Sequence, residues 1–452
     1  MIAALILSLV ASFGVLWAPP SRAADQEAAP GGDRAPWTLA RVLEAARRES
    51  PAVQAAKAAG RADAAEGATA WSALSPKISA RGGVTRSNDP ALLFSQRLWQ
   101  GRFTAGDFAL DALNEPGPRS ALEYGLVLEQ PIWNGGAEVT APAVASSARR
   151  EAGAASRAAV ADALLDAVRR YVGYVSARER SLADSTALVA ARAAHAAAVE
   201  RHRHGQIPDL DTLRTFARAA EGIERSLTSG RDRDVARRRL GDLIGASPTD
   251  EEIASPEPAD PAAFFTGAEA AGREPTPPEL EASRARARRL GLEASRAALR
   301  LLPSLNGRVA VTYYRDPELD DVERRWFAGL SLDWPLWDGA LRWNERRAAA
   351  ARADGARAEL EAAKRDLAAR EEAARRDLEI AGPRRDAARA ARHASEEALR
   401  LATARYRAGL LPLDEWLAVD AEAARARERQ IAREADVQLA GYTYLHAIGG
   451  LK

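Results

Sequence analysis

The chain repeats one pattern of residues across most of its length, and this duplication limits the folds that it can adopt. The segment GLVLEQPIWNGG corresponds to GLSLDWPLWDGA at an offset of 204 residues, and the same offset relates ERHRHGQIPDLDTL to ARYRAGLLPLDEWL. Upstream, SPAVQAAKAAGR corresponds to PPELEASRARAR at an offset of 227. We therefore interpret the chain as two copies of one unit, the first with 23 extra residues between Pro76 and Pro131.

Each copy predicts the same order of elements. After a short helix, segments in which apolar and polar residues alternate, such as RWFAGLSLDW, predict a β-hairpin at about 76–132 and a second at about 303–336. Alanine-rich segments then predict long helices and their return helices. The expected ranges are 137–204, 209–245, 340–408 and 413–449. The Gly382–Pro383 pair predicts a kink or a break in the second long helix.

The fold class is therefore mainly α with β, and helices of about 65 residues, roughly 100 Å long, favour coiled-coil packing. An apolar run, followed by small residues at Ser21 and Ala23, predicts a secretory signal peptide. The expected segments are a signal peptide (1–23), a first repeat (24–246), a Pro-rich connector (247–277) and a second repeat (278–452).

A Pro-x-Trp-x-Gly motif follows the second strand of each hairpin. Its members are Pro131, Trp133 and Gly135 in the first copy and Pro335, Trp337 and Gly339 in the second. Because proline cannot donate to a β-ladder, we expect both prolines to end their strands. The glycines let the chain turn into the long helix. The tryptophan rings suit a membrane–water boundary, and the alternative is that they are core side chains of a small sheet.

Four strands cannot close a barrel, because even the smallest membrane barrels need about eight. An open sheet in lipid would leave backbone groups at its edges unsatisfied. After the N-terminal run, no segment approaches about 18 uninterrupted apolar residues, so any later membrane contact is expected through strands. If these strands face lipid, several chains must combine them, and the polar face then lines water.

Composition and motifs exclude several classes of function. The 64 basic and 63 acidic residues are intermixed, which is typical of solvated helix faces and unlike the basic stripe of a nucleic-acid-binding protein. The sequence contains no G-x-S-x-G, HExxH, P-loop or glycine-rich dinucleotide motif. We therefore expect no enzyme activity and no cofactor. We expect no metal site either, because His202 and His204 are two residues apart and cannot share one helix face.

The duplicated order of helix, hairpin, P-x-W-x-G motif, long helix, R-x-x-x-G turn and return helix resembles the TolC-like outer-membrane efflux protein family over roughly Trp37 to Gly450. The resemblance implies a homotrimer, in which three sets of four strands close an outer-membrane β-barrel that a coiled-coil α-helical tunnel continues across the periplasm. It also implies a passive channel of a tripartite efflux pump or a type I secretion system. Its implied partners are outer-membrane lipid, a periplasmic membrane-fusion adaptor and an inner-membrane RND or ABC transporter.

In the family, the turn after each long helix is the periplasmic tip, where the channel narrows. Gly205 and Gly409 lie at these turns, and Asp211 and Glu415 match acidic residues of the family's entrance constriction. Tyr406 matches a tyrosine that holds the tip closed. Inward carboxylates repeated by symmetry would attract cations. The alternative is that both acids are solvated residues that stabilise a helix N-terminus.

Two departures from the family pattern concern the same tip. The archetype has an arginine where this chain has Leu411 and an aspartate where it has Ala418, so we expect the closing network to be incomplete. The 23 extra residues include Phe94, Trp99 and Phe103. We expect this insertion to fold over the extracellular mouth; contact with an external ligand is the alternative.

Two rival functions remain open on the sequence alone. One is a periplasmic coiled-coil structural protein without a pore. The other is a metal-dependent periplasmic hydrolase that uses the tip histidines, which include His195. Neither explains why hairpins stand at matching points of the two copies.

Overall fold

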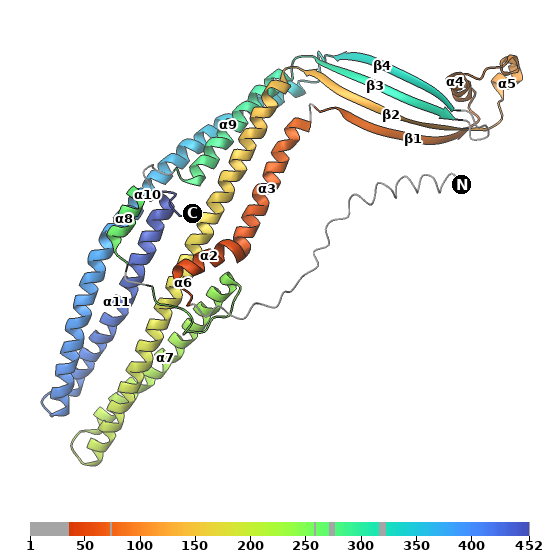
Figure 1. Cartoon of the computed structure of the whole chain (residues 1–452). Helices are drawn as coiled ribbons and strands as arrows, with labels where there is room; N and C mark the ends of the chain where they lie inside the picture. Colours follow the sequence, from red (N-terminus) through yellow and green to blue (C-terminus); the bar gives the residue numbers. More distant parts are fainter. Residues whose placement is uncertain (1–35, 73–74, 257–258, 271–275, 316–321, 452) are drawn as a thin grey trace.

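The chain is described by a computed structural model for residues 36–72, 75–256, 259–270, 276–315 and 322–451. The predicted signal peptide lies outside these residues. Long helices lie side by side along most of the molecule, with a sheet at one end and two helix–helix turns at the other (Figure 1). Among the described residues, no helix combines the length and the apolarity that crossing a membrane requires.

The two copies contain corresponding elements in the same order. The first copy contains α2 (Leu39–Glu49), α3 (Pro51–Ser72), β1 (Lys77–Ser87), α4 (Pro90–Gln100), η2 (Ala105–Phe108), α5 (Leu110–Asn114), β2 (Arg119–Asn134), α6 (Ala137–Arg203) and α7 (Asp209–Ile244). After α8 (Pro261–Ala270), the second copy contains α9 (Pro278–Leu299), β3 (Ser304–Arg315), β4 (Val322–Asp333), α10 (Leu341–Arg407) and α11 (Leu413–Ala447). The mainly helical fold with four strands and an internal duplication is confirmed.

The four strands form one antiparallel sheet in the order β1-β2-β3-β4. Leu126 pairs with Val311, and Val311 pairs with Trp326, so these side chains share one face, here called the apolar face. Gly125, Thr312 and Arg325 form the neighbouring row, so they lie on the opposite face, here called the polar face. The apolar face is bare, with Trp326 75% exposed.

Pro131 does not end its strand, contrary to the sequence prediction. β2 continues to Asn134, and its register with β3 shifts between Pro131 and Trp133. A β-bulge leaves a ladder position unpaired, so a residue without an N–H is tolerated there. Pro335 does lie outside its strand, because β4 ends at Asp333.

Gly382 and Pro383 do not break α10, which runs from Leu341 to Arg407 as one helix. Proline inside a helix costs roughly 3 kcal/mol, so packing must offset the cost. Ala381 and Gly382 are buried, and a Cβ added to Gly382 would lie 3.1 Å from Cγ of Pro261, at the start of α8. The glycine therefore lets α8 pack closely against α10 beside the proline.

The main apolar core lies midway along the rod, where α2, α6 and α7 meet. Its fully buried members include Val42, Leu164, Val168 and Leu240. Ile253 of the connector completes this core. The duplicated helices are therefore held together near their middle, and their ends extend away from it.

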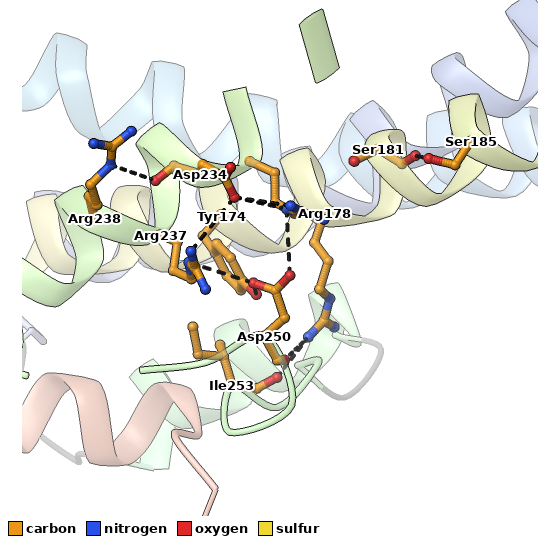
Figure 2. Close-up of polar contacts among 10 residues, drawn as sticks. Tyr174, Arg178, Ser181, Ser185, Asp234, Arg237, Arg238, Asp250 and Ile253 are labelled. Atoms are coloured by element: carbon orange, nitrogen blue, oxygen red, sulfur yellow. Dashed lines mark hydrogen bonds and ion pairs between the residues drawn. The ribbon is translucent and has the colours of Figure 1, made fainter. Parts of the chain in front are cut away.

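The first half of the connector is fastened to α6 by polar contacts (Figure 2). The Tyr174 hydroxyl donates to Oδ1 of Asp250 over 2.8 Å, and the Tyr171 hydroxyl donates to the carbonyl of Ala254 over 2.6 Å. Arg178 donates to the carbonyl of Ile253 over 2.7 Å. Burial, and for Tyr174 also the bond to Asp250, raises the pKa of both tyrosines to about 12. We call this set of contacts the polar clamp.

The second half of the connector is fastened to α10 and α11 mainly by apolar contacts. The Phe264 and Tyr442 rings lie 5.5 Å apart, edge to face, and the Phe265 and Tyr444 rings lie 5.2 Å apart. A Cβ added to Gly441 would lie 2.4 Å from the Phe264 ring, so the helix surface is hollowed there to receive it. We call this set, together with the Gly382–Pro261 contact, the apolar clamp.

Candidate functional site: two strand–helix junctions and two helical tips

Both strand–helix junctions turn through left-handed backbone conformations. Gly135 has φ +63° and Gly136 φ +89°, while Gly339 has φ +68° and Ala340 φ +66°. Ala340 is the one described residue other than glycine with a positive φ. Because a left-handed conformation disfavours residues with a Cβ, the turn into α10 carries strain that the turn into α6 avoids.

The surroundings of the two junctions differ more than their backbones. A Cβ added to Gly135 would lie 2.4 Å from the carbonyl oxygen of Leu299, at the end of α9, whereas a Cβ added to Gly339 would meet none of the described residues within 4 Å, chain neighbours aside. Trp133 is 36% exposed and Trp337 is 81% exposed. A side chain as exposed as that of Trp337 does not belong to a core, so the alternative of a core tryptophan is wrong for Trp337.

Arg342, in the first turn of α10, holds the second junction. Its Nε donates to Oδ2 of Asp338 over 2.7 Å, and one Nη donates to the carbonyl of Arg300 over 3.1 Å. A second Nη bonds to the carbonyl of Pro335. One guanidinium therefore ties the end of α9, the loop after β4 and the start of α10 together.

The first tip, between α6 and α7, is an open turn. Gly205 has φ +69°, and a Cβ added there would meet no described residue within 4 Å apart from its chain neighbours. Asp211 lies in the first turn of α7, where a negative charge is favourable, and no hydrogen bond or ion pair of its carboxylate is found among the described residues. On α7, Leu210, Leu213 and Phe216 are each more than half exposed.

The second tip, between α10 and α11, has a small core of its own. Trp416 is buried against Leu413 and Ala402, and its ring stacks on Tyr406 at 5.4 Å. Its indole N–H donates to Oγ1 of Thr403 over 3.0 Å. Gly409 has φ +74° at the turn, and Glu415 lies exposed in the first turn of α11.

Two arginines of the first copy connect the tips. One Nη of Arg201 donates to the carbonyl of Arg407 over 2.6 Å, and the guanidinium lies 5.4 Å from the centre of the Tyr406 ring. Nε of Arg218 donates to Asp420 over 3.0 Å. A cation at the C-terminus of α10 satisfies carbonyls that the helix leaves unpaired. The sequence prediction found Tyr406 but missed Arg201, because nothing in a linear sequence marks a contact across 205 positions.

One group of side chains could in principle hold a metal ion. Ligand atoms of Asp162, Glu279 and His446, from three helices, lie within 4.8 Å of one another. Nε2 of His446 already lies 2.8 Å from Asp162, and Glu279 accepts from Arg370 over 2.6 Å, which lowers the pKa of the Glu279 carboxyl. A guanidinium on one ligand opposes a second cation, so this group is a satisfied ion network. The tip histidines are not part of it.

Comparisons with known proteins agree with this architecture. Residues 276–450 match the sequence profile of the family described as "Outer membrane efflux protein". No match was found among curated protein sequences.

Three solved structures share the fold over most of their length. The CmeC outer membrane channel of Campylobacter jejuni has 15% identity and a TM-score of 0.76, with 91% of this chain and 85% of that chain covered. The outer membrane protein VceC of Vibrio cholerae has 18% identity and a TM-score of 0.74, with 91% and 96% covered. The MtrE outer membrane channel of Neisseria gonorrhoeae, solved in an open state, has 15% identity and a TM-score of 0.71, with 92% and 89% covered. At these identities the likeness shows a common fold.

Proposed function

We propose that this chain is an outer membrane efflux protein, as the match of residues 276–450 to that family supports, and that three copies assemble into a passive duct from the periplasm to the cell exterior. The protein lies in the outer membrane and extends into the periplasm. In this proposal the chain divides as the sequence predicts, into repeats over 24–246 and 278–452 that flank a connector over 247–277.

The observation that carries the proposal is the unfinished sheet. Its apolar face exposes Leu126 (58%), Trp326 (75%) and Leu330 (71%), which is unfavourable in water and favourable in lipid. Among the described residues, β1 and β4 each have one unpaired edge. Unpaired backbone groups in lipid cost several kcal/mol each, so neighbouring copies must supply the missing partners. Closure then turns the polar face toward an aqueous bore.

The junctions and the tips acquire roles from this assembly. Trp133 and Trp337 lie where the sheet meets the helices, which would be the inner boundary of the membrane. Asp211 and Glu415, repeated in three copies, would surround the periplasmic entrance with carboxylates. We propose that the Arg201 contacts with Tyr406 and Arg407 hold the two tips of one copy together in a closed entrance.

The proposed partners follow from what a passive duct lacks. The sequence carries no nucleotide-binding motif, so a separate inner-membrane RND or ABC transporter would supply the energy. A periplasmic adaptor would bridge the transporter and the tips. The family and the fold are those of channel proteins, and we propose that the chain catalyses no reaction.

Conductance of the purified oligomer in planar bilayers tests the duct and its entrance. We expect an ionic current that prefers cations, and we expect Asp211→Asn with Glu415→Gln to reduce that preference about two- to fivefold. Asp209→Asn with Asp414→Asn is the matched control, because these acids occupy the same first turns. Absence of current from every form would favour the rival coiled-coil structural protein.

The proposed tip closure has its own test. Arg201→Ala should raise the open probability of the channel, because it removes the link between α6 and the end of α10. Arg203→Ala is the control, because Arg203 pairs with Glu200 on its own helix. Equal open probabilities in the two variants would rule out Arg201 as a closing contact.

A further inference from the structure

The insertion between β1 and β2 packs on the polar face of the sheet. Trp99, near the end of α4, packs against Tyr314 of β3 with the rings tilted by 32° and their centres 5.4 Å apart. Tyr314 pairs with Glu123 and Glu323, and this row adjoins the row that contains Arg325. Because neighbouring positions of a strand alternate between faces, Tyr313 lies on the apolar face and Tyr314 lies on the polar face. α4 therefore covers the side of the sheet that does not face lipid.

The C-terminus of α4 is fixed to that face by a specific contact. Nε of Arg325 donates to the carbonyl of Trp99 over 2.9 Å. This carbonyl is one of those that a helix leaves unpaired at its C-terminus, where a cation is also favourable. The next turn passes through Gly101 at φ +66°, and a Cβ added there would lie 3.1 Å from an Nη of Arg325.

The rest of the insertion is a compact unit. Phe94 and Phe103 lie with ring centres 4.7 Å apart, and Phe103 and Phe108 lie 5.2 Å apart. Asp107 accepts from the backbone of Thr104, a bond that lowers the pKa of the carboxyl. Figure 1 shows α4 and α5 at the end of the strands farthest from the helices. The insertion is thus a folded element with its own cluster of aromatic rings, of which Phe94 and Phe108 are partly exposed.

We propose that α4 forms a constriction at the outer end of the channel, with Trp99 and Arg325 as the contacts that hold it against the wall of the bore. This inference rests on the proposed function, because the polar face lines the bore only after the barrel closes. A helix with its side chains is about 10 Å across. Three such helices projecting inward would set the largest solute that leaves the channel, independently of the tips.

Single-channel conductance and the permeation of neutral polymers of graded size test the constriction. In one variant an Asn-Gly turn replaces residues 88–118, which keeps the β1–β2 hairpin. In a second variant, Trp99→Ala with Arg325→Ala, the insertion is retained without these two contacts. We expect both variants to raise conductance about twofold or more and to admit larger polymers. Cleavage by trypsin at Arg97 or Arg102 should also become faster in the second variant.

Arg81→Ala is the matched control. Arg81 lies on the same polar face, in the same row as Arg325, and no hydrogen bond or ion pair of its guanidinium is found among the described residues. It should alter the charge of the bore without releasing α4. If the wild type conducts and neither variant exceeds the Arg81→Ala control, the constriction is overturned and the duct stands. If no form conducts, the duct and the constriction are both overturned.

Discussion

Three positions that contact the connector in the first copy have counterparts in the second copy at the offset of 204 residues. The pairs are Tyr174 and Leu378, Arg178 and Gly382, and Arg237 and Gly441. In the first copy all three approach the connector with polar atoms, two of them toward the Asp250 carboxylate. In the second copy two glycines leave space that Pro261 and Phe264 enter. The connector therefore contacts corresponding positions in both copies, through polar atoms in the first copy and through apolar packing in the second. The duplicated positions keep the location of the contact, while its chemistry differs.

Of the substitutions that test the two clamps, Arg178→Ala should weaken the attachment of the connector the most. Arg178→Ala removes bonds to the carbonyls of Asp250 and Ile253 and to Ser255, and leaves acceptors without a donor. We expect the free energy of opening the 247–256 segment to fall by about 3 kcal/mol, measured by amide hydrogen exchange. The exposed Arg180→Ala is the control. Equal exchange in both variants would mean that the polar clamp does not hold the connector.

Filling the hollow of the apolar clamp should have the next largest effect. Gly441→Ala places a methyl group against the Phe264 ring, and overpacking of this kind costs about 2 kcal/mol. Exchange should rise in α8 and leave the 247–256 segment unchanged. The control is Gly355→Ala in α10, where an added Cβ would meet no described residue outside its own helix backbone within 4 Å and helix propensity favours alanine. A rise in both halves would show that the two clamps act as one unit.

Both clamps should weaken at alkaline pH, because burial also raises the pKa of Tyr442 in the apolar clamp. The polar clamp contains two such tyrosines and should respond more strongly. The pKa of Tyr174 is raised from 10.0 to about 12 by burial and by its bond to Asp250. Between these values the unfolded chain has lost the proton that the folded chain keeps, so stability falls as pH rises through this window. Tyr171 shares this shift. Tyr171→Phe with Tyr174→Phe should reduce the alkaline loss, measured by thermal unfolding from pH 9 to 12. An unchanged pH profile would contradict this assignment.

Gly382→Ala should have the smallest effect. The added Cβ would lie 3.1 Å from Cγ of Pro261, and the resulting strain is opposed by the better helix propensity of alanine. We expect a net change within about 0.5 kcal/mol in the unfolding free energy. A loss as large as that of Gly441→Ala would mean that α8 cannot shift at this point and that the close approach is essential.

Much of this fold could be predicted because its signals are local and occur twice. Alternation located all four strands, and alanine-rich stretches located α6 and α10. The two departures, the strand that continues past Pro131 and the helix that is not broken at Pro383, concern prolines whose surroundings are set by distant residues. Pro131 is accommodated by a bulge opposite β3, and Pro383 is accommodated in a helix packed by α8. Neither compensation is visible within a few residues of the proline.

The candidate sites were less predictable than the fold. The roles of Asp211, Glu415 and the junction motif remain predictions, because they depend on neighbouring copies. The contacts of Arg201 with Arg407 and of Arg325 with Trp99 join residues more than 200 positions apart. Arginines are frequent in this sequence, so no local pattern distinguishes these two. Only the folded chain identifies them.

The long helices α6 and α10 each contain 67 residues. One inserted residue would advance a helix by ~1.5 Å and rotate everything beyond it by about a quarter turn or more. The tip of the altered copy would then lie at a different height from the tip of the other copy, and a different helix face would point toward it. A change of depth in such a molecule must therefore be made in both halves of the gene together, in near-whole heptads. The length of the helical part can therefore change only in discrete steps.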